Sequence, residues 1–79
     1  MHHNELKKLT MWDPKFIQCG VVRVEYNRVR VFKDQYNSIT IDVGTPVQMA
    51  LWSGDVLNVY LGNGRVRRYK DRVNYSTMG

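Results

Sequence analysis

The chain has 79 residues and a formal net charge of +5, with 12 Lys and Arg residues against 7 Asp and Glu residues. This length leaves room for one domain, and a hydrophobic content of 43% excludes an intrinsically disordered chain. The surplus of basic residues favours a partner with negative charge, and both nucleic acids and acidic proteins fit that description.

Cysteine content and hydropathy indicate the compartment. Cys19 is the single cysteine, so an internal disulfide is excluded and a reducing, cytoplasmic compartment is expected. The first residues lack the basic and apolar regions of a signal peptide. No apolar run approaches the ~20 residues that a membrane span needs, so no membrane partner is expected.

One helix is predicted near the N-terminus. Asp13 is a good N-cap, Pro14 suits the first helical position, and Gly20 stands where a helix would stop. These signals predict a short helix over residues 14–19 that directs Phe16 toward the core.

The two ends of the predicted domain, which spans residues 1–79, are expected to be less regular. Residues 1–13 are interpreted as an N-terminal extension, in which 4–9 fits a short helix or a leading strand equally well, and Trp12 is expected in the core. Residues 76–79 are expected to form a loose tail.

From residue 21 onward apolar and polar residues alternate, which indicates β-strands. A two-residue loop at Asn27-Arg28 would join the first two strands and place Glu25 and Arg30 opposite each other as an ion pair. The other face of this hairpin would then collect the residues Val22, Val24, Tyr26, Val29 and Val31.

Further alternating segments follow, separated by short turns rich in Gly. They span residues 38–43, 47–52, 56–61 and 65–70, with a short edge piece at 73–75. This pattern predicts an all-β fold with a short N-terminal helix, in which five or six antiparallel strands form a small, partly open barrel of SH3-like or OB-like type. The residues predicted to be buried are Val22, Val24, Val31, Ile39, Ile41, Val59 and Leu61.

The basic residues gather in one segment. Residues 65–72 carry a net charge of +4, because five basic residues stand against Asp71 alone. The five are Arg65, Arg67, Arg68, Lys70 and Arg72. Arginine and lysine contact phosphates, so this segment is the candidate binding site.

The turn before this segment decides which side chains it exposes. A two-residue turn at Asn63-Gly64 would put Tyr60, Arg67 and Tyr69 on the solvent face and Val66 in the core. Arg68 and Lys70 would then point to the core side, which requires a bulge or the end of the core. Tyrosines beside arginines favour single-stranded nucleic acid, because the rings stack on bases.

Other interpretations remain open at this point. Tyrosine and arginine also suit a solvent-facing strand that has no ligand, and arginines protect a sheet edge from aggregation. The chain also fits a protein-interaction module, such as an accessory or inhibitory factor, that binds an acidic partner, with Trp52 or Met49 in a hydrophobic contact. A third alternative is a structural subunit that self-assembles into a homo-oligomer.

No catalytic constellation is visible. His2 and His3 stand at the N-terminus, the carboxylates are dispersed, and Cys19 fits a buried, inert thiol. We therefore expect no enzyme, no metal ligands and no cofactor.

Overall fold

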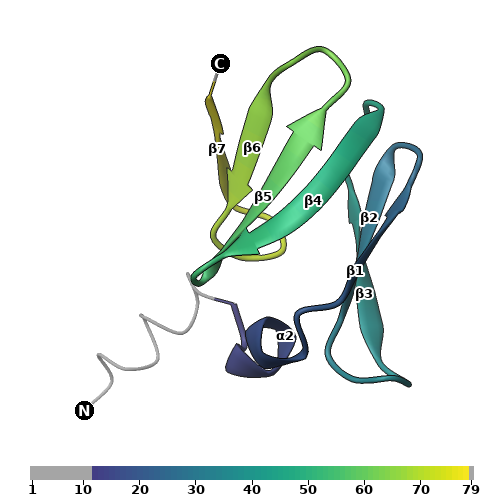
Figure 1. Ribbon diagram of the computed structural model, residues 1–79, viewed down its shortest axis with the longest axis vertical. Coiled ribbons are helices and arrows are strands. Elements are labelled where there is room, and N and C mark those ends of the chain that lie inside the picture. The colour runs from purple at the N-terminus through teal and green to yellow at the C-terminus, as the bar shows by residue number, and fades with distance from the viewer. Residues whose placement is uncertain (1–11, 79) are drawn as a thin grey trace.

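The computed structural model describes residues 12–78 and contains a short helix followed by seven strands in two antiparallel sheets. The sheet orders are β1-β2-β3 and β4-β5-β6-β7, and the two sheets flank helix α2 (Figure 1). The elements are α2 (Pro14–Cys19), β1 (Val22–Glu25), β2 (Arg28–Phe32), β3 (Ser38–Asp42), β4 (Val47–Ser53), β5 (Val56–Leu61), β6 (Val66–Tyr69) and β7 (Tyr75–Met78). The prediction of a small, mostly β domain with a short helix is confirmed. The count of five or six strands is wrong, and no closed barrel forms within residues 12–78.

Helix α2 has the bounds and the caps that the sequence predicts. The Asp13 carboxylate accepts a hydrogen bond from the Lys15 backbone N–H at 3.0 Å, and Pro14 occupies the first turn. Gly20 ends the helix with a φ of +72°, a left-handed conformation that favours glycine, and its N–H donates to the Phe16 carbonyl. Phe16 is buried, as expected.

The first hairpin has the predicted faces but a different turn. Its loop is Tyr26-Asn27 rather than Asn27-Arg28, so the cross-strand partner of each residue changes by two positions. Because this shift is even, the strand residues stay on their predicted faces. Tyr26 therefore lies in the turn with a φ of +59° and an exposed fraction of 74%, and its predicted place on the inward face is wrong. The predicted ion pair does form: Arg30 Nε lies 3.4 Å from Glu25 Oε2, diagonally across the strands.

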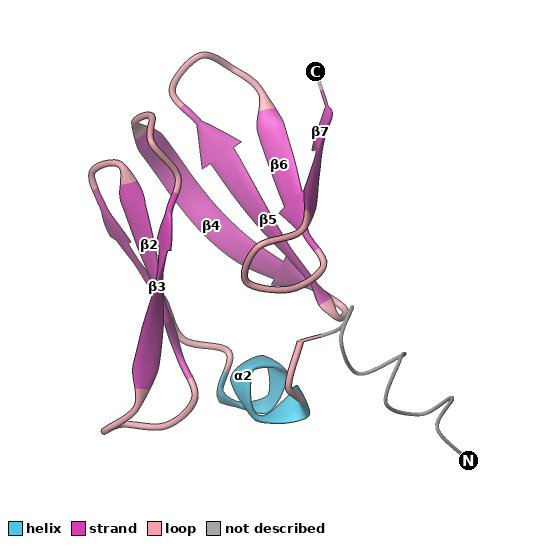
Figure 2. Ribbon diagram, turned by 180° about the vertical axis from the view of Figure 1, so that it is seen from behind, coloured by secondary structure: helices cyan, strands magenta, loops and turns pink. Residues whose placement is uncertain are grey.

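The same turn joins the two sheets. The Tyr26 carbonyl accepts a hydrogen bond from the Val47 N–H at the start of β4, at 2.8 Å. The Asn27 carbonyl accepts from the N–H groups of Val43 and Gly44, at 3.0 and 3.2 Å. These bonds hold the β3–β4 connection against the first hairpin, and Figure 2 shows the two sheets converging with α2 below them.

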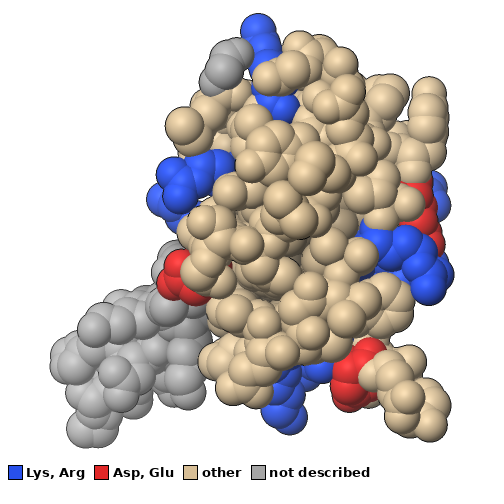
Figure 3. Space-filling model, viewed as in Figure 1, with Lys and Arg blue, Asp and Glu red and all other residues tan. Residues whose placement is uncertain are grey.

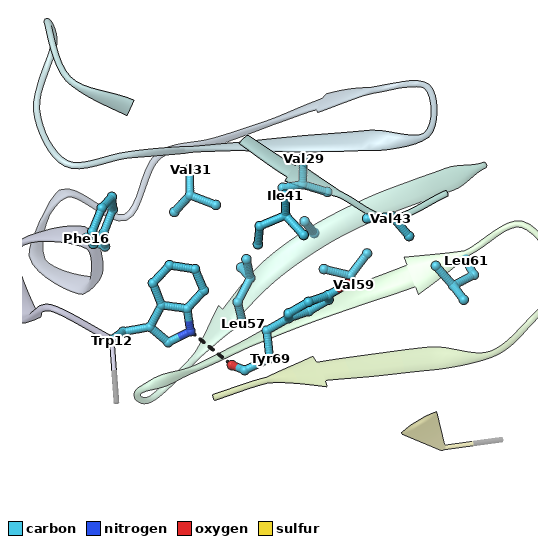
Figure 4. Close-up of a cluster of buried hydrophobic side chains, with 11 residues drawn as sticks. Trp12, Phe16, Val29, Val31, Ile41, Val43, Leu57, Val59, Leu61 and Tyr69 are labelled. Carbon is cyan, nitrogen blue, oxygen red and sulfur yellow. Dashed lines mark hydrogen bonds between the residues drawn. The ribbon is translucent and has the colours of Figure 1, made fainter. Parts of the chain in front are cut away.

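One hydrophobic core lies between the sheets and the helix (Figure 4). Trp12 closes one end: its indole N–H donates to the Tyr69 carbonyl at 3.0 Å, and its ring packs edge-on against Phe16 and Trp52. Trp12 belongs to the core, as predicted, and Trp52 is half-buried at the core border. The buried residues are Trp12, Phe16, Val29, Val31, Ile41, Val43, Ala50, Leu57, Val59, Leu61 and Tyr69.

The predicted core is confirmed for its central members. Among the seven predicted residues, those buried are Val31, Ile41, Val59 and Leu61, and those half-buried against the core are Val22, Val24 and Ile39. The C-terminal expectation is wrong. Residues 76–78 belong to β7, which pairs with β6 over four residues, so this segment is a strand and not a loose tail.

Candidate functional site

The loop between β5 and β6 has three residues, Gly62-Asn63-Gly64. The Leu61 N–H donates to the Arg65 carbonyl at 2.9 Å, and the Gly64 N–H donates to the Leu61 carbonyl at 3.1 Å. Gly64 has a φ of +89°, which is the left-handed position that a three-residue hairpin loop requires. The two-residue turn predicted at Asn63-Gly64 is therefore wrong by one residue.

That one residue exchanges the two faces of β6. Val59 pairs with Arg67, and Asn58 pairs with Arg68, so Arg67 stands on the core side and Arg68 on the solvent side. The prediction placed Arg67 outside and Arg68 inside, and both placements are wrong. Val66, predicted in the core, lies on the solvent side and is half-buried.

Arg67 is engaged inside the molecule. Its Nη1 donates to the Val43 carbonyl at 3.0 Å and to the Tyr69 hydroxyl at 3.2 Å, and its guanidinium carbon lies 4.6 Å from the centre of the Tyr75 ring. Tyr69 is 2% exposed, so its ring is not accessible to a nucleic-acid base. Arg67 therefore links the β3–β4 connection to β6 and β7. Its guanidinium, which the sequence assigns to phosphate binding, is engaged by these contacts within the protein.

The remaining residues of the predicted site differ in their exposure. Arg65, Arg68, Lys70 and Arg72 are exposed, and Tyr60 is half-buried. On the face shown in Figure 3, the basic atoms form separate groups around the margin, and a broad area without charge lies between them. Arg65 and Lys70 stand beyond opposite ends of β6, and Arg72 stands in the loop before β7, so the predicted site is spread along and beyond one strand.

The solvent-facing side of β4–β7 has a different character. We call this side the outer face. Its side chains form two neighbouring rows that run across the four strands, and the first row consists of four apolar side chains. The first row crosses all four strands through Met49, Tyr60, Val66 and Met78. The second row consists of Leu51, Asn58, Arg68 and Ser76. Met49, Leu51 and Met78 are 44%, 49% and 52% exposed, which is unusual for large apolar side chains aligned on one sheet.

Charge is nearly absent from this sheet. The residues of β4–β7 include no Asp, Glu or Lys, and Arg67 and Arg68 are their only charged residues. With Arg67 on the core side, Arg68 is the single charge of the outer face. Next to it the Asn58 Oδ1 atom is buried and has no hydrogen-bond partner among the described residues. The combination of Met, Tyr and Arg without acids or lysines matches the composition of protein–protein contacts.

Sequence reasoning named only part of this surface. Met49 and Tyr60 were candidates, and the structure places both on the outer face. Trp52, the other candidate for an interface, lies on the core side of β4 beside Trp12, so it does not join Met49. Leu51, Val66 and Met78 were missed, and the alternation of β4 was the signal that pointed to Leu51.

Cys19, which the sequence predicts to be a buried and inert thiol, is the last residue of α2. It is half-buried rather than buried, and it lines an apolar hollow of about 380 Å³ beside Val22 and Phe32. Within residues 12–78, no group of three His, Cys, Asp or Glu side chains is arranged to hold a metal ion.

None of the family models, curated proteins or solved structures with which the chain was compared matches it. In the part of the chain that the structure describes, no helix has the length and apolar character to cross a membrane.

The adjacent arginines on opposite faces make a matched pair for mutation. Arg67→Ala removes two hydrogen bonds from a charged group and a contact with the Tyr75 ring, so we expect it to lower the free energy of unfolding by about 2–3 kcal/mol. Arg68→Ala should change it by less than about 0.5 kcal/mol, because Arg68 is exposed. Urea unfolding followed by tryptophan fluorescence measures both, and equal losses in the two variants would contradict this register.

Asp71 fixes the loop that brings β7 beside β6. Its Oδ1 accepts from the N–H groups of Val73 and Asn74 at 2.8 and 2.7 Å, and its Oδ2 accepts from the Asn74 side-chain amide at 2.7 Å. Burial of this carboxylate raises its pKa, but the hydrogen bonds from Asn74 and Val73 outweigh burial and bring the pKa below its ordinary value of 3.8.

The lowered pKa gives a stability that depends on pH. A carboxylate with a lowered pKa stabilises the folded state above its unfolded pKa, and this contribution is lost as the pH falls through the lower folded value. We expect Asp71→Ala to reduce the free energy of unfolding by about 1–3 kcal/mol at pH 7, with the difference narrowing as the pH drops below 3.8. Urea unfolding of both proteins between pH 7 and pH 2.5 measures it, and a difference that stays constant over this range would refute the role of the charge.

Proposed function

We propose that this protein is a protein-interaction module that binds an acidic protein partner through the outer face of β4–β7. The observation that carries the proposal is the row of Met49, Tyr60, Val66 and Met78, which crosses the whole sheet on its solvent side. Removing apolar surface from water contributes roughly 25 cal/mol of favourable free energy per Å², so a partner that covers this row would gain binding free energy from it.

The charges of the sheet support an acidic partner. Arg68 is the only charge on the outer face, and Arg65 and Lys70 flank β6 at its two ends, both exposed. No carboxylate within β4–β7 neutralises them. A carboxylate of the partner would pair with Arg68, while the apolar row supplies the centre of the contact.

Nucleic acid is the second candidate, and the exposed Arg65, Arg68, Lys70 and Arg72 favour it. The outer face offers it little else. Tyr60 is its only aromatic side chain, because Tyr69 faces the core, and its Met, Leu and Val side chains do not stack on bases as rings do. Self-assembly through two outer faces would bring two Arg68 side chains into the contact with no carboxylate from β4–β7 of either copy.

Photo-crosslinking tests the proposal. We expect p-benzoylphenylalanine at position 51 to form protein adducts in cells, and the same residue at position 40 to form none, because Thr40 lies on the other sheet. The protein identified should then bind the purified wild type, and Leu51→Glu should weaken this affinity about tenfold, ~1.4 kcal/mol, at unchanged melting temperature. Thr40→Glu is the matched control and should leave the affinity unchanged.

The same variants distinguish the second candidate. Binding of a single-stranded oligonucleotide whose log affinity falls steeply with log salt, by about 0.7 per neutralised phosphate, would favour nucleic acid. In that case Arg68→Glu would weaken binding and Leu51→Glu would not. The protein-interaction proposal would be overturned by that pattern together with equal crosslinking at positions 51 and 40.

A further inference from the structure

Strand β7 forms the open edge of the four-stranded sheet. It pairs with β6 in a regular register, all four of its residues are exposed, and within residues 12–78 its only backbone partner is β6. The opposite edge, β4, is less open, because its register shifts between Val47 and Met49 and the Val47 N–H donates to Tyr26.

The hydrogen-bond pattern shows which groups face the open edge. The Lys70 N–H donates to the Asn74 carbonyl at 2.9 Å, so this pair belongs to the hydrogen-bonded set of the β6–β7 ladder. Pairs alternate along an antiparallel ladder, so Ser76 and Met78 direct their N–H and C=O groups to β6. Tyr75 and Thr77 therefore direct theirs away from β6, where an added strand would meet them.

Apart from its shortness, this edge lacks, within residues 12–78, the features that usually prevent strand addition. Natural edges carry lysine, proline, an inward charge or a bulge. The sequence of β7 is Tyr-Ser-Thr-Met, without charge or proline, and its register has no bulge. The edge is also held in place by the Tyr75 ring. Its centre lies 4.9 Å from the centre of the Tyr69 ring and 4.6 Å from the guanidinium carbon of Arg67.

The neighbouring side chains define what an added strand should carry. Ser76 pairs with the exposed Arg68 on the outer face, and its small side chain leaves Arg68 uncovered on the β7 side. Adjacent strands lie about 4.8 Å apart, so a carboxylate opposite Ser76 would start roughly 10 Å from the Arg68 backbone, within the combined reach of the two side chains. A residue opposite Met78 would extend the apolar row of the outer face.

We infer that the partner adds an extended strand to the free edge of β7, with an acidic residue opposite Ser76 and apolar residues two positions before and after it. This inference rests on the proposed function, because it specifies the partner of the same sheet. A second copy of β7 fits less well, since its residues Tyr75–Met78 offer no carboxylate to Arg68. The two ladder positions at Tyr75 and Thr77 supply the backbone bonds of the added strand.

A palindromic peptide tests the inference without assuming a strand direction. The probe is the capped heptapeptide Thr-Val-Thr-Glu-Thr-Val-Thr, and its control has Lys in place of Glu. We expect the Glu peptide to shift the backbone amide resonances of Tyr75 and Thr77, to slow their hydrogen exchange, and to bind about fivefold more tightly than the Lys peptide. Absence of these shifts, or equal binding of both peptides, would overturn the inference.

A matched pair of variants isolates the edge. Thr77→Pro removes an N–H that faces the open edge while leaving the ladder to β6 intact. It should therefore abolish peptide binding, while the NMR resonances of β4–β6 stay unchanged. Thr77→Ala retains the N–H and should bind as the wild type does. Equal binding by the two variants would contradict edge addition. The outer face is tested separately, since Leu51→Glu acts on crosslinking and partner affinity and does not touch β7.

Discussion

The left-handed backbone at Gly64 is the constraint on which the character of this surface depends. It allows a three-residue loop between β5 and β6, and the loop length sets the register of β6. Because side chains alternate along a strand, the register decides which of two adjacent arginines enters the core region. Arg67 lies on the core side and Arg68 on the solvent side, so one register sets which side chains of β6 line each face of the sheet.

Inside the sheet, Arg67 connects parts of the chain that are distant in sequence. Its bonds to the Val43 carbonyl and the Tyr69 hydroxyl, with the Tyr75 ring stacked on it, tie β6 to the β3–β4 connection and to β7. Outside, the same register leaves a surface of Met, Tyr and Val side chains with Arg68 as its single charge. An apolar centre with one arginine fits a protein contact better than a phosphate groove.

Local signals predicted the elements that depend on them. The Asp13 cap, Pro14 and Gly20 gave both ends of α2, and the alternation of residues 56–61 gave both ends of β5. The faces of β6 were not predictable in this way, because Gly-Asn-Gly suits a two-residue or a three-residue loop. The partner of Arg67 is the carbonyl of Val43, 24 residues away, and a backbone acceptor at that distance leaves no trace in the sequence. For β7 the sequence predicts an edge piece at 73–75 and a tail at 76–79, because the exposed residues of this strand show no apolar alternation.

The register of the β5–β6 hairpin can be measured directly by NMR. The Leu61–Arg65 hydrogen bond makes Asn58–Arg68 a non-hydrogen-bonded pair, in which the two Cα atoms approach most closely, at about 4.5 Å. We expect a strong Hα–Hα NOE between Asn58 and Arg68 and another between Tyr60 and Val66. Hα–Hα NOEs between Val59 and Arg68 and between Leu61 and Val66 in their place would show a two-residue turn, return Arg67 to the surface, and contradict this register.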